Sequence, residues 1–221
     1  MNAALKFPAG LYGVTPEWED AYTLEIAVHA AARGGMTSLQ LRHKGQDKAL
    51  RREIAQGLQA ICREASVVFL INDDWRLALE IGADGVHLGR DDESPALVRE
   101  QAGPNFLIGV SCYADAARAQ AFLNEETYPE LDVAYIAFGA MFASQTKPLA
   151  PPAPHSVLAS GRALCEQKPV PRPGVVAIGG ITVQNAHQIV AAGADTIAVV
   201  GGLFLAEDIE VAARNLCTHF A

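Results

Sequence analysis

Residues 67–74 read Val-Val-Phe-Leu-Ile-Asn-Asp-Asp, and residues 85–92 read Gly-Val-His-Leu-Gly-Arg-Asp-Asp. Both segments are short apolar runs that end in acidic residues. An uninterrupted apolar run of this length is typical of a parallel strand that is buried on both faces. Because the carboxyl ends of neighbouring parallel strands open into one crevice, the acidic residues of both segments should meet there. A hard divalent cation such as Mg²⁺ prefers oxygen ligands of this kind.

The same alternation of apolar runs and Ala-rich amphipathic stretches fills the whole chain. Eight runs are predicted to be strands, at residues 11–14, 38–41, 67–71, 85–88, 106–110, 133–138, 175–178 and 196–200. Helical periodicity separates them, for example over 48–64, 115–124 and 184–192. Eight such units predict an α/β fold, a (β/α)8 TIM barrel with residues 1–221 as a single catalytic domain. The main alternative is a doubly wound open sheet, but no Gly-x-Gly-x-x-Gly follows the first strand to support its dinucleotide-binding version.

A short internal repeat favours the barrel. Gly-Ala-Asp at residues 82–84 recurs at 193–195, about half the chain later. Each copy stands between a predicted helix and the next predicted strand, where glycine can adopt the left-handed conformation that ends a helix. The repeat places the fourth and eighth strands half a barrel apart.

Composition limits the classes of function. The chain has 221 residues, 50% of them hydrophobic, and a formal net charge of -8, which argues against a general nucleic-acid surface. No apolar run reaches the length of a membrane span, and no signal pattern opens the chain. The four cysteines form no Cys-x-x-Cys pair, which indicates reduced thiols in a cytoplasmic protein. The oligomeric state is not predicted.

Residues just past the strand ends of a barrel converge on one mouth. Here they include cations, carboxylates, hydroxyl groups and two glycine pairs, at residues 40–44, 72–73, 91–92, 111–112, 144–147, 179–180 and 201–202. The glycine pairs allow backbone N–H groups to approach a phosphate closely, although they could simply turn the chain. Three cations beside a Mg²⁺ site, Arg42, Lys44 and Lys147, would suit a diphosphate.

Helix capping is the alternative role for the acidic residues. Asp73 could cap a helix that starts at Trp75, and Asp91 or Asp92 could cap a helix that begins near Pro95. Finding carboxylates after two adjacent strands, with cations facing them, favours metal binding. Asp73 and Asp92 are the predicted ligands, while Asp74 and Asp91 are expected to cap helices or to support the ligands.

General bases are scarce at the predicted mouth. There is no lysine at a strand centre for a Schiff base and no evident Ser/His/Asp set, and His87 is expected to be packed and hydrogen-bonded rather than catalytic. Residues 142–154, rich in proline, follow the sixth strand and could form a mobile lid or an ordinary connection. Such a site suits a reaction that is driven by loss of a diphosphate and needs little proton transfer.

These motifs together resemble those of the thiamine phosphate synthase family. The matching segments are spread in order over nearly the whole chain, at 11–15 (Leu-Tyr-Gly-Val-Thr), 40–44 (Gln-Leu-Arg-His-Lys), 71–74, 82–92, 109–111, 138–148 and 178–182 (Ile-Gly-Gly-Ile-Thr). The resemblance implies a transferase that condenses 4-amino-2-methyl-5-hydroxymethylpyrimidine diphosphate with a thiazole phosphate. The products would be thiamine phosphate and diphosphate, with Mg²⁺ as the cofactor.

The resemblance also implies roles for individual residues. The pyrimidine diphosphate would be bound by Gln40, Arg42, Lys44, Asn72, Ser111 and Lys147, of which Arg42, Lys44, Ser111 and Lys147 are the expected catalytic residues. Mg²⁺ would be held by Asp73 and Asp92. The thiazole phosphate would be bound by Ser144, Gln145, Thr146, Gly180, Val200 and Gly201.

The chain departs from the usual family pattern at four places. His43 stands where Glu is usual, Arg-Asp at 90–91 where Gln-Glu is usual, Ala-Ser-Gln at 143–145 where Pro-Thr-Ser is usual, and Gly201 where Ser is usual. The last two lie in the expected thiazole-phosphate pocket, and they keep a non-catalytic thiazole- or thiamine-phosphate-binding paralogue as one alternative. The related thiazole tautomerase is the other, but its catalytic histidine has no counterpart in residues 138–142.

We predict that Lys147→Ala lowers turnover strongly and leaves the fold intact, because the variant loses a charge that would stabilise the leaving diphosphate. Steady-state kinetics, with circular dichroism as the control for folding, would check this. Near-normal turnover in the folded variant would rule out the role assigned to Lys147.

Overall fold

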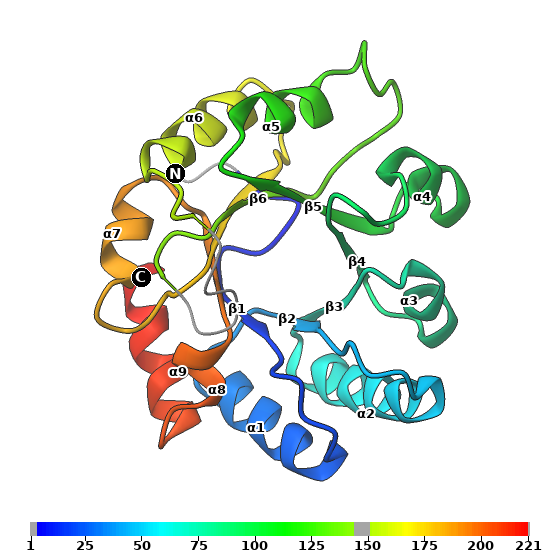
Figure 1. Ribbon diagram of the computed structural model, residues 1–221, viewed down its shortest axis with the longest axis vertical. Coiled ribbons are helices and arrows are strands. Elements are labelled where there is room, and N and C mark those ends of the chain that lie inside the picture. Colours follow the sequence, from blue (N-terminus) through cyan, green and yellow to red (C-terminus); the bar gives the residue numbers. More distant parts are fainter. Residues whose placement is uncertain (1–3, 144–150, 221) are drawn as a thin grey trace.

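A computed structural model describes residues 4–143 and 151–220 of the chain. Eight parallel strands form a closed barrel in chain order, and helices surround it on the outside (Figure 1). The first strand pairs with both the second and the eighth, which closes the sheet. The predicted barrel is therefore confirmed, and the open doubly wound sheet is excluded.

The strands lie close to their predicted positions. They are β1 Gly10–Val14, β2 Ser38–Leu41, β3 Val68–Asn72, β4 Gly85–Leu88, β5 Leu107–Tyr113, β6 Tyr135–Gly139, β7 Gly174–Ile178 and β8 Thr196–Val199. The largest difference is the end of β5, which runs past the predicted residue 110. Its register against β6 shifts between Ser111 and Tyr113, so a β-bulge carries the strand further toward the mouth.

The helices alternate with the strands along the chain. They are α1 Ala21–Arg33, α2 Lys48–Ala65, α3 Trp75–Ile81, α4 Pro95–Ala102, α5 Ala116–Leu123, α6 Ser156–Cys165, α7 Ala186–Ala191, α8 Gly201–Phe204, α9 Ile209–Cys217 and the 3-10 helix η1 Thr218–Phe220. None of the helices within residues 4–143 and 151–220 is long and apolar enough to cross a membrane. All four cysteine thiols are free, as the sequence predicts.

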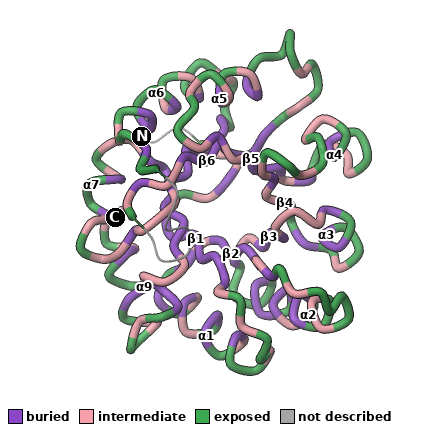
Figure 2. Tube along the Cα trace, in the orientation of Figure 1, coloured by how far each residue is buried: buried purple, intermediate pink, exposed green. Residues whose placement is uncertain are grey.

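Two apolar cores hold the barrel together. The larger core lies between the strands and the helices, where Figure 2 shows buried helix faces turned inward. The smaller core fills the inside of the barrel with Phe7, Tyr12, Leu70, Tyr135 and Val176 among its members. The Phe7 ring centroid lies 4.4 Å from that of Tyr135 and 5.1 Å from that of Tyr12. This packing gives the barrel a solid interior beneath the strand ends.

The two Gly-Ala-Asp segments have the same structural role. Asp84 and Asp195 each precede a strand, and each carboxylate accepts a hydrogen bond from the backbone N–H of the preceding strand, Phe69 at 2.7 Å and Val175 at 2.9 Å. Asp195 is also bound by both terminal nitrogens of Arg172, at 2.8 and 2.9 Å. The side chains of Arg172 and Asp195 are 3% and 6% exposed, so this is a buried ion pair.

We predict that Asp195→Ala costs about 3–5 kcal/mol of unfolding free energy, because it leaves a buried guanidinium unpaired. Asp84→Ala is the matched control, since Asp84 is exposed and its loss removes a backbone hydrogen bond worth about 1 kcal/mol. Urea denaturation of both variants would measure the difference. Equal losses would contradict the importance of the buried pair.

Candidate active site

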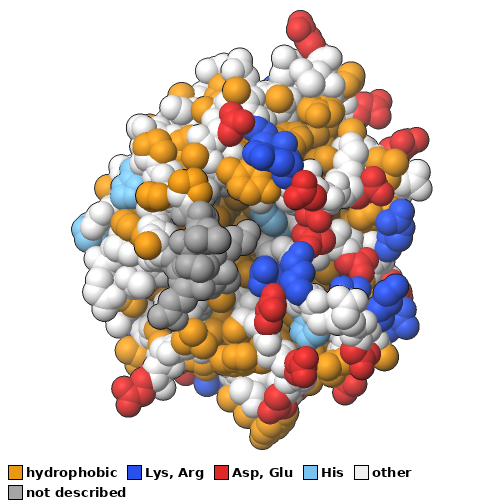
Figure 3. Space-filling view, viewed as in Figure 1, with side chains coloured by type: hydrophobic (Ala, Val, Ile, Leu, Met, Phe, Trp, Pro, Cys, Tyr) orange, Lys and Arg blue, Asp and Glu red, His pale blue; other side chains and the backbone are white. Residues whose placement is uncertain are grey.

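A pocket of about 780 Å³ opens where the strands end, and the predicted site residues lie on its wall. The lining includes Gln40, Arg42, Lys44, Asn72, Asp73, Asp92, Ser111, Gly180, Val200 and Gly201. Ser144, Gln145, Thr146 and Lys147 lie outside the described residues, as does most of the predicted lid at 142–154. Figure 3 shows basic and acidic side chains side by side on the same face of the molecule.

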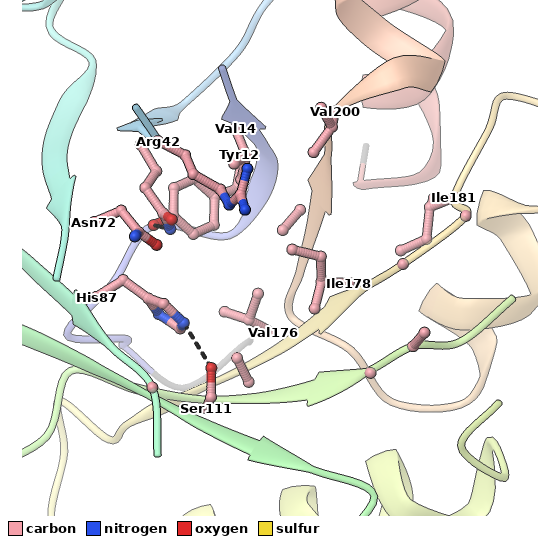
Figure 4. Close-up of a pocket in the computed structure, with 18 of the residues that line it drawn as sticks. Tyr12, Val14, Arg42, Asn72, His87, Ser111, Val176, Ile178, Ile181 and Val200 are labelled. Carbon is pink, nitrogen blue, oxygen red and sulfur yellow. Dashed lines mark hydrogen bonds between the residues drawn. The ribbon is translucent and has the colours of Figure 1, made fainter. Parts of the chain in front are cut away.

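The two sides of the pocket differ in character. Figure 4 shows Arg42, Asn72 and His87, which follow or belong to β2, β3 and β4, on one side. Val176, Ile178 and Val200, from β7 and the end of β8, lie on the other. A charged ligand part would therefore bind against β2–β5, and an apolar ring against β7 and β8.

Asp73 and Asp92 come together on the polar side. Burial raises the pKa of the Asp92 carboxyl, and its contact with Asp73 and the charge of that residue raise it further. Lys44 forms an ion pair with Asp73, and Asp92 accepts a hydrogen bond from the Gly89 N–H at 2.6 Å. Two adjacent carboxylates repel each other, and a cation between them would relieve that repulsion.

The structure shows which of the acidic residues cap helices and which do not. Asp74, rather than Asp73, caps α3, since its side chain accepts from the Leu77 N–H at 3.0 Å. Asp73 instead has a left-handed backbone, with φ of 65°, and its N–H donates to the His87 carbonyl at 2.9 Å. Asp91 does not cap α4, because Ser94 occupies the N-cap position of that helix, and the alternative that Asp91 supports the metal ligands stays a prediction.

The metal-ligand set is small. Within the described ranges, no group of three or more His, Cys, Asp or Glu side chains could hold a metal ion together. A cation at the Asp73–Asp92 pair would therefore take its other ligands from water and from ligand oxygens. Mg²⁺ is commonly bound in this way, with one or two carboxylates and the phosphates of a substrate.

Arg42 and Arg90 add positive charge to the polar side of the pocket. The Arg42 guanidinium pairs with Glu17 at 2.5 Å, and its backbone N–H donates to the Thr15 hydroxyl at 2.9 Å. Arg90 stacks over the Tyr113 ring, 4.7 Å from the ring centroid. In a chain with a net charge of -8, these residues and Lys44 supply the local positive charge that a phosphate needs.

A row of hydrogen-bonded side chains crosses the floor of the pocket. It runs from Gln40 through Tyr12, Tyr135 and His87 to Ser111. Figure 4 marks the link between His87 and Ser111. The prediction that His87 is packed and hydrogen-bonded is confirmed. Burial raises the pKa of both tyrosines, so their phenols stay neutral.

The sequence does not single out Tyr12 and Tyr135, because both lie inside predicted strands. Their signal was available, since a tyrosine that points into a barrel needs a partner for its hydroxyl group. Asn185 was also missed. Its side chain donates to the Gly180 carbonyl at 2.9 Å and accepts from the Thr182 N–H at 2.8 Å, which fixes the turn after β7.

The glycine pairs allow two loops to pack tightly beside the pocket. Gly180 has a left-handed backbone, with φ of 63°, and a Cβ there would lie 2.4 Å from the Ala143 carbonyl oxygen. A Cβ on Gly202 would lie 2.4 Å from the Ile181 carbonyl oxygen. The glycines therefore turn the chain and allow this close packing, while their role in binding a phosphate stays a prediction.

Comparison with known proteins gives consistent results. Residues 11–203 match the family model described as thiamine monophosphate synthase. The thiamine-phosphate synthase of Bordetella pertussis is 55% identical, with 98% of this chain and 97% of that protein covered. The one from Halorhodospira halophila is 46% identical, with 100% and 98% covered. The structure of thiamine phosphate pyrophosphorylase from Pyrococcus furiosus aligns with a TM-score of 0.78 and 29% identity, covering 97% of this chain and 96% of that one.

We predict that Gly109→Ala destabilises the barrel by about 1–3 kcal/mol, because the added Cβ would lie 2.0 Å from Cζ of Tyr135 and force that ring to move. Gly174→Ala is the control, since its Cβ would meet its nearest neighbour at 3.7 Å, an ordinary contact. Thermal denaturation of both variants would test this. A Gly109→Ala variant as stable as the control would show that Tyr135 is not held where we describe it.

Proposed function

The chain belongs to the thiamine monophosphate synthase family, and from that premise we propose how its own residues make thiamine phosphate. It is a transferase of thiamine biosynthesis that condenses 4-amino-2-methyl-5-hydroxymethylpyrimidine diphosphate with a thiazole phosphate. Diphosphate is the second product. The main support for this mechanism is the difference between the two sides of the pocket. Paired carboxylates and cations on one side face an apolar wall, flanked by glycine loops, on the other.

The pyrimidine diphosphate would bind on the polar side. Gln40 and Asn72 would contact the pyrimidine part, while Arg42, Lys44, Ser111 and Lys147 would bind the diphosphate. The thiazole ring would lie against the apolar wall, with its phosphate near Gly180, Val200 and Gly201 and near residues 144–146, which lie outside the described ranges. A Cβ on Gly201 would meet the Leu205 side chain at 3.5 Å, an ordinary contact, so this position would also accommodate the serine that is usual in the family.

Asp73 and Asp92 are the proposed ligands of Mg²⁺. Their close approach, the raised pKa of Asp92 and the space around them fit a cation that shares its remaining positions with substrate oxygens. When bound, the ion would supply positive charge that stabilises the departing diphosphate.

We propose a dissociative reaction. The bond between the pyrimidine methylene carbon and the diphosphate oxygen breaks first, and both electrons leave with the oxygen. Arg42, Lys44 and Lys147 hold the diphosphate as its negative charge grows. The electron-rich aminopyrimidine ring stabilises the methylene cation, and the neutral thiazole nitrogen then donates its lone pair to that carbon. No side chain has to remove a proton.

The apolar wall has a separate task in this scheme. A methylene cation reacts with water as well as with the thiazole, so water must be kept away from it. Val176, Ile178 and Val200 cover that side of the pocket with hydrocarbon. Positioning of the thiazole nitrogen against the carbon supplies the rest of the rate.

The purified protein, incubated with both substrates and Mg²⁺, should form thiamine phosphate and diphosphate in equal amounts. Omitting either substrate should abolish the product. Retained ligand binding without product would instead support the non-catalytic paralogue, and thiazole isomerisation without condensation would support the tautomerase.

We predict that Asp92→Asn weakens Mg²⁺ binding by about 100-fold, because it removes one of two charged ligands. Glu126→Gln is the matched control: it makes the same change of charge at an exposed position that does not line the pocket. Titration with Mn²⁺ followed by electron paramagnetic resonance, in the presence of inorganic diphosphate, would measure the affinity. Equal affinities for the two variants would remove Asp92 from the ligand set.

A further inference from the structure

We propose that the row of hydrogen bonds on the pocket floor has one fixed direction, from the Gln40 amide to the Ser111 hydroxyl. Tyr12, Tyr135 and His87 are then positioning residues, which together set what the two ends offer to the substrate. The contacts proposed between this row and the substrate rest on the proposed function. The direction of the hydrogen bonds follows from the five side chains and does not depend on that function.

The contacts form a continuous row across the inside of the barrel. Gln40 Nε2 lies 2.7 Å from the Tyr12 hydroxyl, which lies 2.9 Å from the Tyr135 hydroxyl. That hydroxyl lies 2.8 Å from His87 Nδ1, and His87 Nε2 lies 2.8 Å from Ser111 Oγ. The five side chains come from β2, β1, β6, β4 and β5, so only the closed barrel brings them together.

The Gln40 end determines the direction. An amide NH₂ group can donate hydrogen bonds but cannot accept them. The Tyr12 oxygen therefore accepts from Gln40. Among the described residues its other hydrogen-bond partner is the Tyr135 oxygen, so we assign the Tyr12 hydrogen to that oxygen. The Tyr135 hydrogen in turn points to Nδ1 of His87.

The direction then passes through the imidazole. A neutral histidine whose Nδ1 accepts carries its hydrogen on Nε2. That N–H donates to Ser111 Oγ, which leaves the Ser111 hydrogen to point elsewhere. Ser111 lines the pocket, so its hydroxyl becomes a hydrogen-bond donor toward the ligand.

The two ends match the two parts of the substrate. Because Gln40 Nε2 is held by Tyr12, its Oε1 is left to accept, which suits the exocyclic amino group of an aminopyrimidine. Ser111 donates at the other end, which suits an oxygen of the diphosphate. The row thus selects an amino group over an oxo group on the ring, and it transfers no proton. Gly109 supports it by leaving room for the Tyr135 ring.

The test reads the histidine tautomer in the protein without substrates. Long-range ¹H–¹⁵N correlation spectra of ¹⁵N-histidine protein, with the His87 signals assigned by their loss in His87→Asn or through the backbone, should show the hydrogen on Nε2. A hydrogen on Nδ1 would overturn the proposal. This result does not depend on whether the enzyme forms thiamine phosphate.

A second measurement tests the link to the substrate. Tyr135→Phe should shift His87 toward a mixture of tautomers and lower kcat/KM for the pyrimidine diphosphate by about tenfold, the scale of one lost hydrogen bond. The KM for the thiazole phosphate should not change. Tyr128→Phe, outside the pocket, is the control and should change neither. Lower activity with an unaltered tautomer would mean that Tyr135 only supports the fold, and unaltered activity would remove it as a positioning residue.

Discussion

The pairing of β1 with β8 is the constraint on which the rest of this molecule depends. It closes the sheet, so that all eight strands end at one mouth and side chains far apart in the chain share one pocket. The polar residues after β2–β5 then face the apolar residues of β7 and β8 across a pocket with a volume of about 780 Å³. An open sheet with the same strands would leave these two groups on different edges. The separation of a charged half from an apolar half, which the proposed reaction needs, is thus a product of closure.

Charge and packing shape the two halves differently. On the polar side, opposite charges are already paired: Lys44 with Asp73, and Arg42 with Glu17. The concentration of these cations where the diphosphate would bind allows a chain with a net charge of -8 to receive an anionic substrate. Beneath the pocket, Phe7 and the two tyrosines fill the barrel, and the buried hydroxyl groups must find partners there. The row from Gln40 to Ser111 satisfies that need and reaches the pocket at both ends.

Much of this arrangement could be predicted from the sequence, and the exceptions have identifiable causes. Apolar runs located all eight strands. Their ends included every described residue of the predicted site except Val200, which only the family resemblance indicated, and all of these residues line the pocket. The end of β5 was placed too early because a bulge between Ser111 and Tyr113 leaves no clear sequence signal. The row through Tyr12 and Tyr135 depends on which residues face each other across the barrel, and this follows from register rather than from any local pattern. The choice between Asp73 and Asp74 as the cap likewise needed the backbone conformation. The roles of the individual site residues, including residues 144–147, remain predictions.

The proposed mechanism requires one pocket that holds two anionic ligands in separate halves, of which the diphosphate half alone depends on Mg²⁺. Isothermal titration calorimetry with inorganic diphosphate and with thiazole phosphate, each with and without Mg²⁺ and each in the presence of the other, tests it directly. We expect Mg²⁺ to strengthen diphosphate binding by at least about tenfold and to leave thiazole phosphate binding unchanged. We also expect the two ligands to occupy the pocket at the same time. Competition between the two ligands, or the same dependence on Mg²⁺ for both, would contradict the account.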